Sequence, residues 1–356
     1  MASKGSSPGL TVAVTGPTGD IGKPFLRALD KTPGVGRVIG MARRPFDPAD
    51  LGLNKTEYRQ GDVLDRASVD DLVREADVVV HLAFLIFGTP EEARLTNLEG
   101  STNVFSAAFE AGVKRLVYAS SVAAYGFHQD NPGRLTEDVA ARGSDGHYYS
   151  AQKAEVETVL EDLRMGSGAA TDVYVFRPCI VAGPTATTLI EKIPFVKLGD
   201  KIPGPVRKLV GAIPLLRPVV PDPGVPFQLV HEDDVASALA LAVRGKGAAG
   251  AYNLAADGDI TVSDIAQALG WYSIPIPELA VDATAKIISR LPLLPVEAQW
   301  LDALRVPVLM DTTKACTELG WEPSYDVLDT LAETIQGARH KGLLPWRGGR
   351  EAQGVI

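Results

Sequence analysis

Short, almost continuous apolar runs alternate with helical patterns through the first half of this chain, and this alternation constrains the fold more than any other feature. Strands covered by helices on both faces have such runs, whereas a strand with one wet face alternates apolar and polar residues. The clearest runs are Leu10–Thr15 (LTVAVT) and residues 76–83 (ADVVVHLA). Repeated strand–helix–strand units predict an α/β fold with a doubly wound parallel sheet.

The same patterns predict the other elements of the first half. We expect further strands at residues 37–42, 56–60, 116–120 and 172–177, and helices at 22–30, 65–75, 92–111 and 147–164. In the helix at 92–111, Leu95 and Leu98 are expected to face the core. After Pro178 the chain is rich in proline and apolar residues up to Pro226, and periodic patterns are few.

Charge and cysteine content exclude several classes of protein. The net charge of −9 argues against a nucleic-acid partner, which requires a basic face. No apolar run reaches the roughly 18 residues of a membrane span, and residues 1–9 lack the apolar core of a signal peptide. Cys179 and Cys316 are expected in or near the core, with Met41, and no spacing predicts a metal site. We therefore expect a cytoplasmic protein.

Glycines at positions 16, 19 and 22 directly follow the first predicted strand and open the first helix. In this order Gly16 can make a tight turn, Gly19 can let the backbone approach a pyrophosphate, and Gly22 can let the helix pack close to the strand. The N-terminus of the helix then presents unpaired N–H groups to phosphate. The position of this loop predicts a Rossmann-type domain that binds a dinucleotide.

Two interleaved lobes are therefore expected. We assign residues 1–183 to the dinucleotide-binding domain, and residues 227–256 return to it because 229–242 and 251–254 have the patterns of further sheet-domain elements. Residues 184–226 and 257–356 would form a smaller, mixed substrate-side lobe.

The residues after the second strand bear on the choice between NAD and NADP. An acidic residue there usually binds the ribose hydroxyls of NAD, whereas arginine suits the 2′-phosphate of NADP. Arg43 and Arg44 follow the strand here, and the nearest carboxylate, Asp47, lies beyond Pro45. We expect NADP and leave NAD open, because both arginines could instead be solvated loop charges.

Tyr149 and Lys153 lie four residues apart in a predicted helix, so their side chains share one face. A nearby ammonium favours phenolate, which would let Tyr149 give or take a proton while a hydride moves to or from nicotinamide. Such pairs are common by chance, so a partner hydroxyl is needed. Ser120 and Ser121 end the fifth predicted strand, where an open parallel sheet binds ligands, although both could be turn or capping residues.

Together these residues resemble the extended short-chain dehydrogenase/reductase family, also called the NAD-dependent epimerase/dehydratase family. The likeness extends from Leu10 to about Thr330. The further motifs that carry it are His81-Leu82-Ala83, Asn97-x-x-Gly100, Tyr118-Ala-Ser-Ser-Val-Ala-Ala-Tyr125-Gly126, Arg177-Pro178, Gly183-Pro184, Val230-His231-Glu232-Asp233-Asp234-Val235-Ala236 and Leu319-Gly320-Trp321-x-Pro323.

The resemblance implies a role for each matching residue. Ser121 would be the catalytic hydroxyl, Tyr149 the proton donor or acceptor, and Lys153 its electrostatic partner, which also holds the cofactor ribose. The implied cofactor contacts are Gly16, Gly19, Ile21 and Gly22 at the pyrophosphate, Asp62 and Val63 at the adenine, Leu82 and Ala83 at the nicotinamide-side ribose, and Pro178 and Ile180 at the carboxamide. A homodimer would form through the helices at 92–111 and 147–164.

Departures from the family pattern bear on the substrate. Members that act on nucleotide sugars often have Asn soon after the Arg-Pro pair and Arg just before the late Val-x-Asp segment, and neither is present. The diphosphate-binding arginine is therefore in doubt, although Arg207 or Arg217 could replace it. The loop at 84–87, which begins with Phe84, is apolar, as is much of 190–225. Such a lining suits an apolar carbonyl or alcohol, unless these residues only pack the small lobe.

The leading expectation is an NADP-dependent carbonyl reductase or alcohol dehydrogenase whose substrate contacts Phe84, Ser121 and Tyr149. A nucleotide-sugar epimerase is the alternative; dehydration is disfavoured because Val122-Ala123 stands where dehydratases of this family usually have Asp-Glu. A cofactor-binding regulator without catalysis is a third hypothesis, against which the intact Ser121–Tyr149–Lys153 set argues.

Overall fold

A seven-stranded parallel sheet with the order β10-β6-β5-β4-β1-β2-β3 forms the centre of the molecule. The computed structural model describes residues 9–86, 88–191, 193, 218–276 and 306–344. The strands are β1 (Leu10–Thr15), β2 (Val35–Ala42), β3 (Thr56–Gln60), β4 (Val78–His81), β5 (Arg115–Ala119), β6 (Asp172–Pro178) and β10 (Gly250–Leu254). The chain order reverses between β1 and β4, which confirms the predicted doubly wound, Rossmann-type fold.

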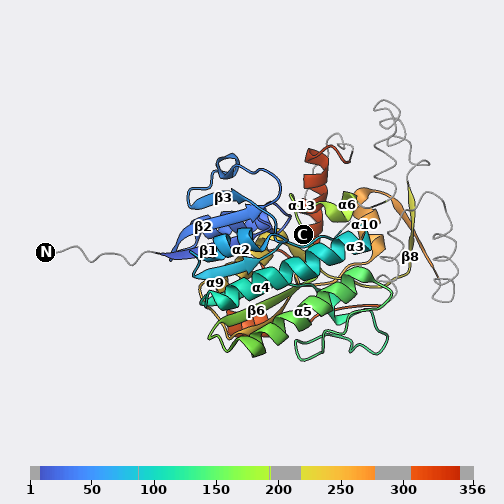
Figure 1. Ribbon diagram of the computed structural model, residues 1–356. Coiled ribbons are helices and arrows are strands. Elements are labelled where there is room, and N and C mark those ends of the chain that lie inside the picture. Colours follow the sequence, from blue (N-terminus) through green and yellow to red (C-terminus); the bar gives the residue numbers. More distant parts are fainter. Residues whose placement is uncertain (1–8, 87, 192, 194–217, 277–305, 345–356) are drawn as a thin grey trace.

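Helices cover both faces of this sheet (Figure 1). One face carries α1 (Gly22–Lys31) and α9 (Glu232–Val243), and the other carries α2 (Arg66–Val73), α4 (Gly100–Glu110) and α5 (Tyr148–Ser167). Successive strand residues point to opposite faces. Val12 and Val14 of β1 therefore pack in one apolar layer with α1 and α9, whereas Ala13 packs in the other layer with α2, α4 and α5.

The helix expected over residues 92–111 is interrupted. α3 (Pro90–Arg94) is followed by a π-helical turn at Leu95–Glu99, and α4 then continues. The wider turn inserts an extra residue and so rotates the buried face of the helix. The expectation for Leu95 was therefore wrong, since it is 46% exposed, and Leu98 is only partly buried, whereas the polar Asn97 is fully buried.

Among the described residues, two small sheets and the helices α6, α10 and α13 belong to the second lobe. β7 (Ile180–Ala182) pairs with β9 (Leu229–His231), and β8 (Val219–Asp222) pairs with β11 (Tyr272–Pro275). The helices are α6 (Thr188–Glu191), α10 (Val262–Leu269) and α13 (Val327–His340). Residues 229–242 were expected to return to the dinucleotide-binding domain. Residues 229–231 pair with β7 outside the main sheet, whereas α9, which follows them, packs on that sheet.

Cys179 and Met41 are buried as expected, but the expectation for Cys316 was wrong because its side chain is exposed. Cys316 lies in a π-helical turn, Ala315–Leu319, in which Ala315 and Leu319 are the residues that face the core. No helix in the described ranges is long and apolar enough to span a membrane.

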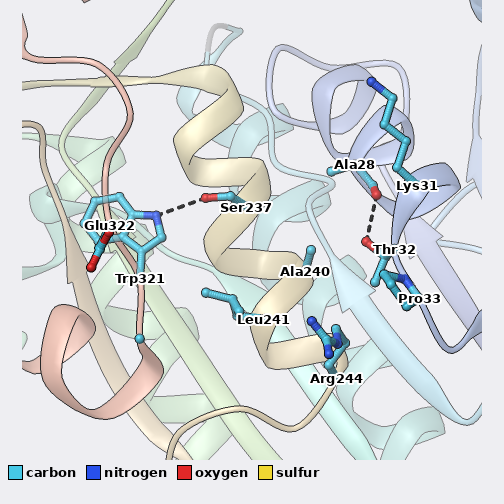
Figure 2. Close-up of a pocket in the computed structure, with 11 residues that line it drawn as sticks. Ala28, Lys31, Thr32, Pro33, Ser237, Ala240, Leu241, Arg244, Trp321 and Glu322 are labelled. Carbon is cyan, nitrogen blue, oxygen red and sulfur yellow. Dashed lines mark hydrogen bonds between the residues drawn. The ribbon is translucent and has the colours of Figure 1, made fainter.

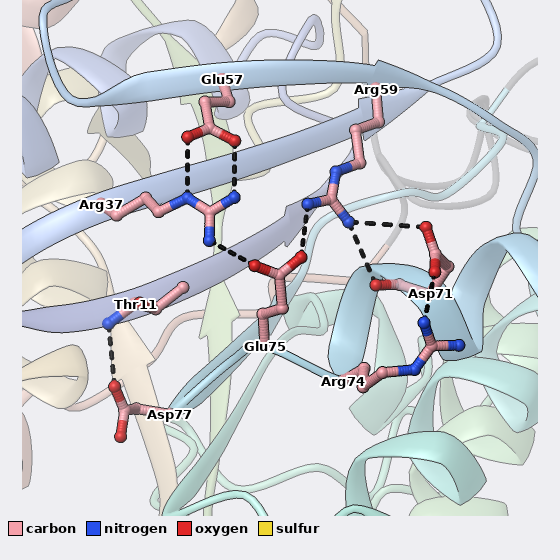
Figure 3. A network of polar contacts seen from close by, with 8 residues as sticks. All are labelled: Thr11, Arg37, Glu57, Arg59, Asp71, Arg74, Glu75 and Asp77. Carbon is pink, nitrogen blue, oxygen red and sulfur yellow. Dashed lines mark hydrogen bonds and ion pairs between the residues drawn. The ribbon is translucent and has the colours of Figure 1, made fainter.

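Alternation along β3 separates two polar surfaces. Glu57 and Arg59 point to one face of the sheet, where they join Arg37 and Glu75 in a solvent-exposed network of ion pairs (Figure 3). Tyr58 and Gln60 alternate with them along the strand and point to the opposite face, toward the loop that follows β2.

Candidate active site

The carboxyl ends of β1, β4, β5 and β6 lie along one edge of the sheet, because these strands are parallel neighbours. The glycine loop follows β1, Leu82 and Ala83 follow β4, and Ser120 and Ser121 follow β5. Pro178 ends β6, and Ile180 begins β7. Open parallel sheets bind ligands at this edge, next to the point where the strand order reverses. Tertiary structure thus brings most of the predicted site residues to one edge of the sheet.

The three glycines of the loop have different requirements. A Cβ on Gly16, whose φ is +71°, would lie 2.7 Å from the Ala83 nitrogen, and a Cβ on Gly22 would lie 2.4 Å from the Gly16 carbonyl oxygen. Protein packing therefore requires glycine at both positions. At Gly19 the nearest atom would be 3.6 Å away, so no described residue excludes a Cβ there.

The N-terminus of α1 has the properties of a phosphate site. Ile21 at the N-cap gives no side-chain hydrogen bond to the first turn, and no acidic residue lies in that turn. The helix dipole then favours a negative charge in front of the helix. Together with the room for close backbone approach at Gly19, these features fit the pyrophosphate of a dinucleotide.

The loop after β2 is held by side chains from β3 that the sequence analysis did not identify. The Tyr58 hydroxyl bonds to the Ala42 carbonyl oxygen at 2.7 Å and also to that of Arg44. Gln60 donates from Nε2 to the Arg43 carbonyl oxygen at 2.9 Å. The side chains of Arg43 and Arg44 are exposed, and neither forms an ion pair within the described residues. The backbone of this loop is thus fixed while both guanidinium groups remain in solvent.

The pair expected near the adenine lies beside the same loop. Asp62 follows β3 and accepts a hydrogen bond from the Leu64 nitrogen at 3.1 Å, as aspartate side chains do in turns. Val63 is buried and packs in the layer with α2 and α4. Its backbone carbonyl accepts from Asn103 Nδ2 at 3.0 Å, which ties this turn to α4.

Ser121, Tyr149 and Lys153 meet between the end of β5 and the start of α5. The Ser121 hydroxyl accepts from the Ala123 nitrogen at 3.2 Å, as a cap of a short 3₁₀ turn, and its interaction with the Tyr149 phenol lowers the pKa of that phenol. One helical turn further on, Lys153 Nζ donates to the Ala119 carbonyl oxygen at 2.8 Å and to the Tyr118 hydroxyl at 3.3 Å. Ser121 is therefore a capping residue, which is one of the two roles considered from the sequence; its catalytic role stays a prediction.

Burial dominates the electrostatics of this pair. It raises the pKa of the Tyr149 phenol to about 12, against the opposing effect of the Ser121 hydrogen bond. It lowers the pKa of the Lys153 ammonium to about 7, against the opposing effect of the Glu157 carboxylate. Titration of Lys153 near neutral pH makes its charge sensitive to its surroundings, which is common at functional sites.

Phe84 covers the same pair from the loop after β4. Its ring centre lies 3.6 Å from Lys153 Nζ, and the ring meets that of Tyr149 edge-on at 5.6 Å. An aromatic face stabilises a nearby cation and excludes water from it. Phe84 thus supplies an apolar wall directly beside the two ionisable side chains.

Asn97 holds this wall in place, and sequence reasoning did not assign it that function. Its Oδ1 accepts from the Leu85 nitrogen at 2.7 Å, and its Nδ2 donates to the Leu85 carbonyl oxygen at 3.0 Å and to Gln152 Oε1 at 2.8 Å. The π-helical turn is what directs this amide inward. The loop that carries Phe84 is consequently tied to α5 beside Lys153.

A separate groove of about 420 Å³ lies between α1, α9 and the segment around Trp321 (Figure 2). α1 begins at the glycine loop and ends at Lys31, so this groove lies at the opposite edge of the sheet from Tyr149 and Lys153. Lys31, Leu241 and Arg244 are among the residues that line it. The groove is not part of the candidate site described above.

Several residues considered from the sequence cannot be placed in this site. Arg207, Arg217 and most of the apolar stretch at 190–225 lie outside the described residues. Within the described part of the chain, no group of three or more His, Cys, Asp or Glu residues could hold a metal ion.

The model of the NAD dependent epimerase/dehydratase family matches residues 12–255, which include the glycine loop, Ser121, Tyr149 and Lys153. The chain belongs to this family. The general kind of chemistry, nicotinamide-dependent oxidoreduction, follows from that membership.

Curated relatives and solved structures agree with this assignment. An uncharacterized protein of Mycobacterium tuberculosis is 25% identical over 343 residues, which cover 94% of this chain and 85% of that protein. Sterol demethylase protein B of Methylococcus capsulatus is 30% identical over 182 residues, 49% of this chain and 52% of that protein. The crystal structure of DesIV, a dTDP-glucose 4,6-dehydratase from Streptomyces venezuelae with NAD and TYD bound, has a TM-score of 0.69 at 22% identity, covering 93% of this chain and 97% of that one. The last comparison shows a shared fold.

Proposed function

We propose that this member of the family is an NADP-dependent dehydrogenase or reductase that acts on an apolar carbonyl or alcohol. The observation that carries the proposal is the contact of the Ser121 hydroxyl with the Tyr149 phenol, with Lys153 one turn further along the same face of α5. Proton donor, partner hydroxyl and cation thus lie together at the edge of the sheet where a dinucleotide is expected.

Each of these residues has a distinct part in the proposed reaction. A bound nicotinamide dinucleotide supplies or accepts the hydride. Ser121 donates a hydrogen bond to the substrate oxygen, and Tyr149 gives that oxygen its phenolic proton during reduction or takes the proton during oxidation. The Lys153 ammonium stabilises the phenolate that remains, because an opposite charge nearby favours the ionised form.

Phe84 supports an apolar substrate. Its ring stands against both Tyr149 and Lys153, so a substrate oxygen that reaches Tyr149 has an apolar surface beside it. A polar group placed there would lose hydration without gaining a partner from the ring. The similarity of half of the chain to a sterol demethylase protein supports the same substrate class.

Three features support NADP as the cofactor. Arg43 and Arg44 follow β2, and their guanidinium groups form no ion pair with described residues. Tyr58 and Gln60 hold the backbone carbonyls of this loop, so the arginines start from a fixed position. Arginine also binds phosphate better than a neutral side chain does, through paired charge-assisted hydrogen bonds.

A nucleotide-sugar epimerase is the second candidate. The shared fold with DesIV, a nucleotide-sugar enzyme solved with NAD and TYD, favours it. Epimerisation could use the same Ser121, Tyr149 and Lys153, and the reaction would regenerate the oxidised cofactor in each cycle. A homodimer through α4 and α5 and a cytoplasmic location remain predictions.

Cofactor titration followed by a substrate panel tests the proposal. NADPH and NADH are titrated separately against purified protein by nicotinamide fluorescence, and apolar ketones and UDP- and dTDP-sugars are then supplied. Preferential binding of NADPH and its oxidation by a ketone support the proposal. Tight retention of NAD, with conversion of a nucleotide sugar and no net redox change, would establish the epimerase instead.

A further inference from the structure

Three consecutive residues at the end of β5 each contact a different residue of one stripe on α5. The stripe consists of Tyr149, Lys153 and Glu157, at intervals of four residues, so all three lie on one helix face. The Ser121 hydroxyl interacts with the Tyr149 phenol and lowers its pKa, and the Ala119 carbonyl oxygen accepts from Lys153 at 2.8 Å. Ser120, between them, donates to Glu157 Oε1 at 2.5 Å. The third member of the stripe has no part in the reaction proposed above.

Glu157 is a nearly buried carboxylate with a complete set of partners. Its side chain is 11% exposed and forms an ion pair at 2.6 Å with Arg177. The side chain of Arg177 is 8% exposed. Arg177 Nε also donates to Glu157 Oε1 at 3.1 Å, and the guanidinium lies 4.5 Å from the ring centre of Tyr125. Glu157 thus joins α5 to the ends of both β5 and β6.

A buried ion pair is weak evidence of stability by itself, because desolvation offsets much of the Coulomb attraction. It does, however, place a fixed negative charge one helical turn from Lys153. In a medium of low effective dielectric constant such a charge acts strongly on its neighbours. The location of the pair therefore indicates an effect on the lysine.

The ionisable groups around Lys153 come from four elements. Tyr149 and Glu157 are on α5, and Tyr118 is on β5, with its hydroxyl at 3.3 Å from Nζ. His81 on β4 is buried between Thr15 Oγ1 at 2.7 Å and Ser101 Oγ at 2.9 Å; burial and the Lys153 charge lower its pKa to about 3, so it is neutral. Arg177 on β6 is a cation beyond Glu157. Among the described groups, Glu157 is the acidic side chain that favours the ammonium form of Lys153.

We propose that Glu157 is the counter-charge of Lys153 and, together with Arg177, a positioning residue of the catalytic site. The proposal rests on the function assigned above, since it concerns the lysine of that site. Glu157 would keep Lys153 cationic in a pocket that Phe84 and α5 shield from water. Its bond with Ser120 would also hold the end of β5 in register with the helix, so that Ser121 meets Tyr149.

The test measures the charge of Lys153 directly, without substrate or cofactor. Protein with ¹⁵N-labelled lysine is titrated across the pH range in which it remains folded, and the Nζ resonance of Lys153 is assigned by its loss in Lys153→Met. Glu157→Gln keeps an oxygen acceptor for Ser120 but removes the charge. We expect the pKa of Lys153 to fall by about one unit or more, since a nearby opposite charge has effects of this size.

Two further variants separate charge from structural disturbance. Glu155→Gln changes the same charge on the same helix, but Glu155 is 43% exposed and pairs with Arg94 at 3.2 Å, so the pKa of Lys153 should not move. Arg177→Met removes a cation from the far side of Glu157, so the pKa of Lys153 should not fall. If Glu157→Gln fails to fold alone, it is introduced into Arg177→Met, where it leaves no unpaired buried charge, and compared with that single variant.

An unchanged pKa of Lys153 on loss of Glu157, in a folded protein, would overturn the proposal. An equal fall in Glu157→Gln and Arg177→Met would also overturn it, because a general disturbance would then be the cause. Failure of the oxidoreductase assignment is a different outcome, seen in the cofactor and substrate measurements and not in this titration.

Discussion

The two ends of the proposed crevice lie on the same sheet edge but consist of different chemical groups. At the β1–β2 end, backbone groups dominate: a glycine loop, an uncapped helix start, and a loop from which Arg43 and Arg44 extend into solvent. At the β5–α5 end, side chains dominate: Tyr149 and Lys153 are buried, and Lys153 is hydrogen-bonded to residues of β5. Substitutions at the first end can therefore change the cofactor charge that it prefers without disturbing the core. Substitutions at the second end affect both the chemistry and the packing of buried side chains.

The largest effect is expected at the buried end. Tyr149→Phe removes one oxygen atom and the proton it carries, and turnover should fall by about 10²- to 10⁴-fold, the usual contribution of a general acid or base. Initial rates measure turnover, and fluorescence titration should show that NADPH still binds. Tyr148→Phe is the matched control, because it removes the same atoms from the neighbouring residue. The Tyr148 hydroxyl donates to the Ile86 carbonyl oxygen at 2.6 Å and has no part in the proposed reaction. Unchanged turnover in Tyr149→Phe would remove Tyr149 from the mechanism.

The glycine loop should separate folding from binding. A Cβ at position 22 would lie 2.4 Å from the Gly16 carbonyl oxygen, so Gly22→Ala should lower the free energy of unfolding by about 1–3 kcal/mol, as overpacking does. Gly19→Ala, where the nearest atom is at 3.6 Å, should leave stability nearly unchanged and weaken NADPH binding. Urea denaturation and fluorescence titration measure the two quantities. Equal destabilisation by both substitutions would contradict the assignment of Gly19 to the cofactor.

The exposed arginines should change cofactor preference alone. Replacing Arg43 and Arg44 together with glutamine should raise the Kd for NADPH by about 10- to 100-fold, since charge-assisted hydrogen bonds to the 2′-phosphate would be lost. The Kd for NADH and the melting temperature should change little, because both side chains are exposed. Parallel titrations with the two cofactors make the comparison. Similar losses for NADPH and NADH would rule out the 2′-phosphate role.

The smallest effect is expected in the surface network beside β3 (Figure 3). Hydrogen bonds from Arg37 and Arg59 lower the pKa of the Glu75 carboxyl to about 2. Because the folded pKa is depressed, the stabilisation is present above the unfolded pKa and is lost as pH falls through about 2. Glu75→Gln should therefore lower the melting temperature slightly at neutral pH and low salt. This difference should shrink with added salt and on acidification, and a salt-independent difference would point to packing instead.

Much of the fold could be predicted from local pattern. The apolar runs located the strands of the main sheet within a few residues, and the position of the glycine loop between β1 and α1 predicted the domain type. Both signals are local, because an apolar run or a glycine at a tight turn reflects constraints within a few residues of chain. The π-helical turn at Leu95–Glu99 left no such signal, so the burial of Leu95 was predicted wrongly and the inward-facing amide of Asn97 was missed.

The sequence by itself determined the strands of the main sheet, the glycine loop and the face of α5 that carries Tyr149 and Lys153. The same interval of four residues leads to Glu157 and could have identified it, but nothing local indicated a buried charge there. Only the tertiary structure decided that Ser120 contacts Glu157, that Ser121 contacts Tyr149, and that Arg177 of β6 forms an ion pair with Glu157. The reason is physical: the charge state of a buried group depends on what surrounds it in space, and those neighbours come from strands far apart in the chain.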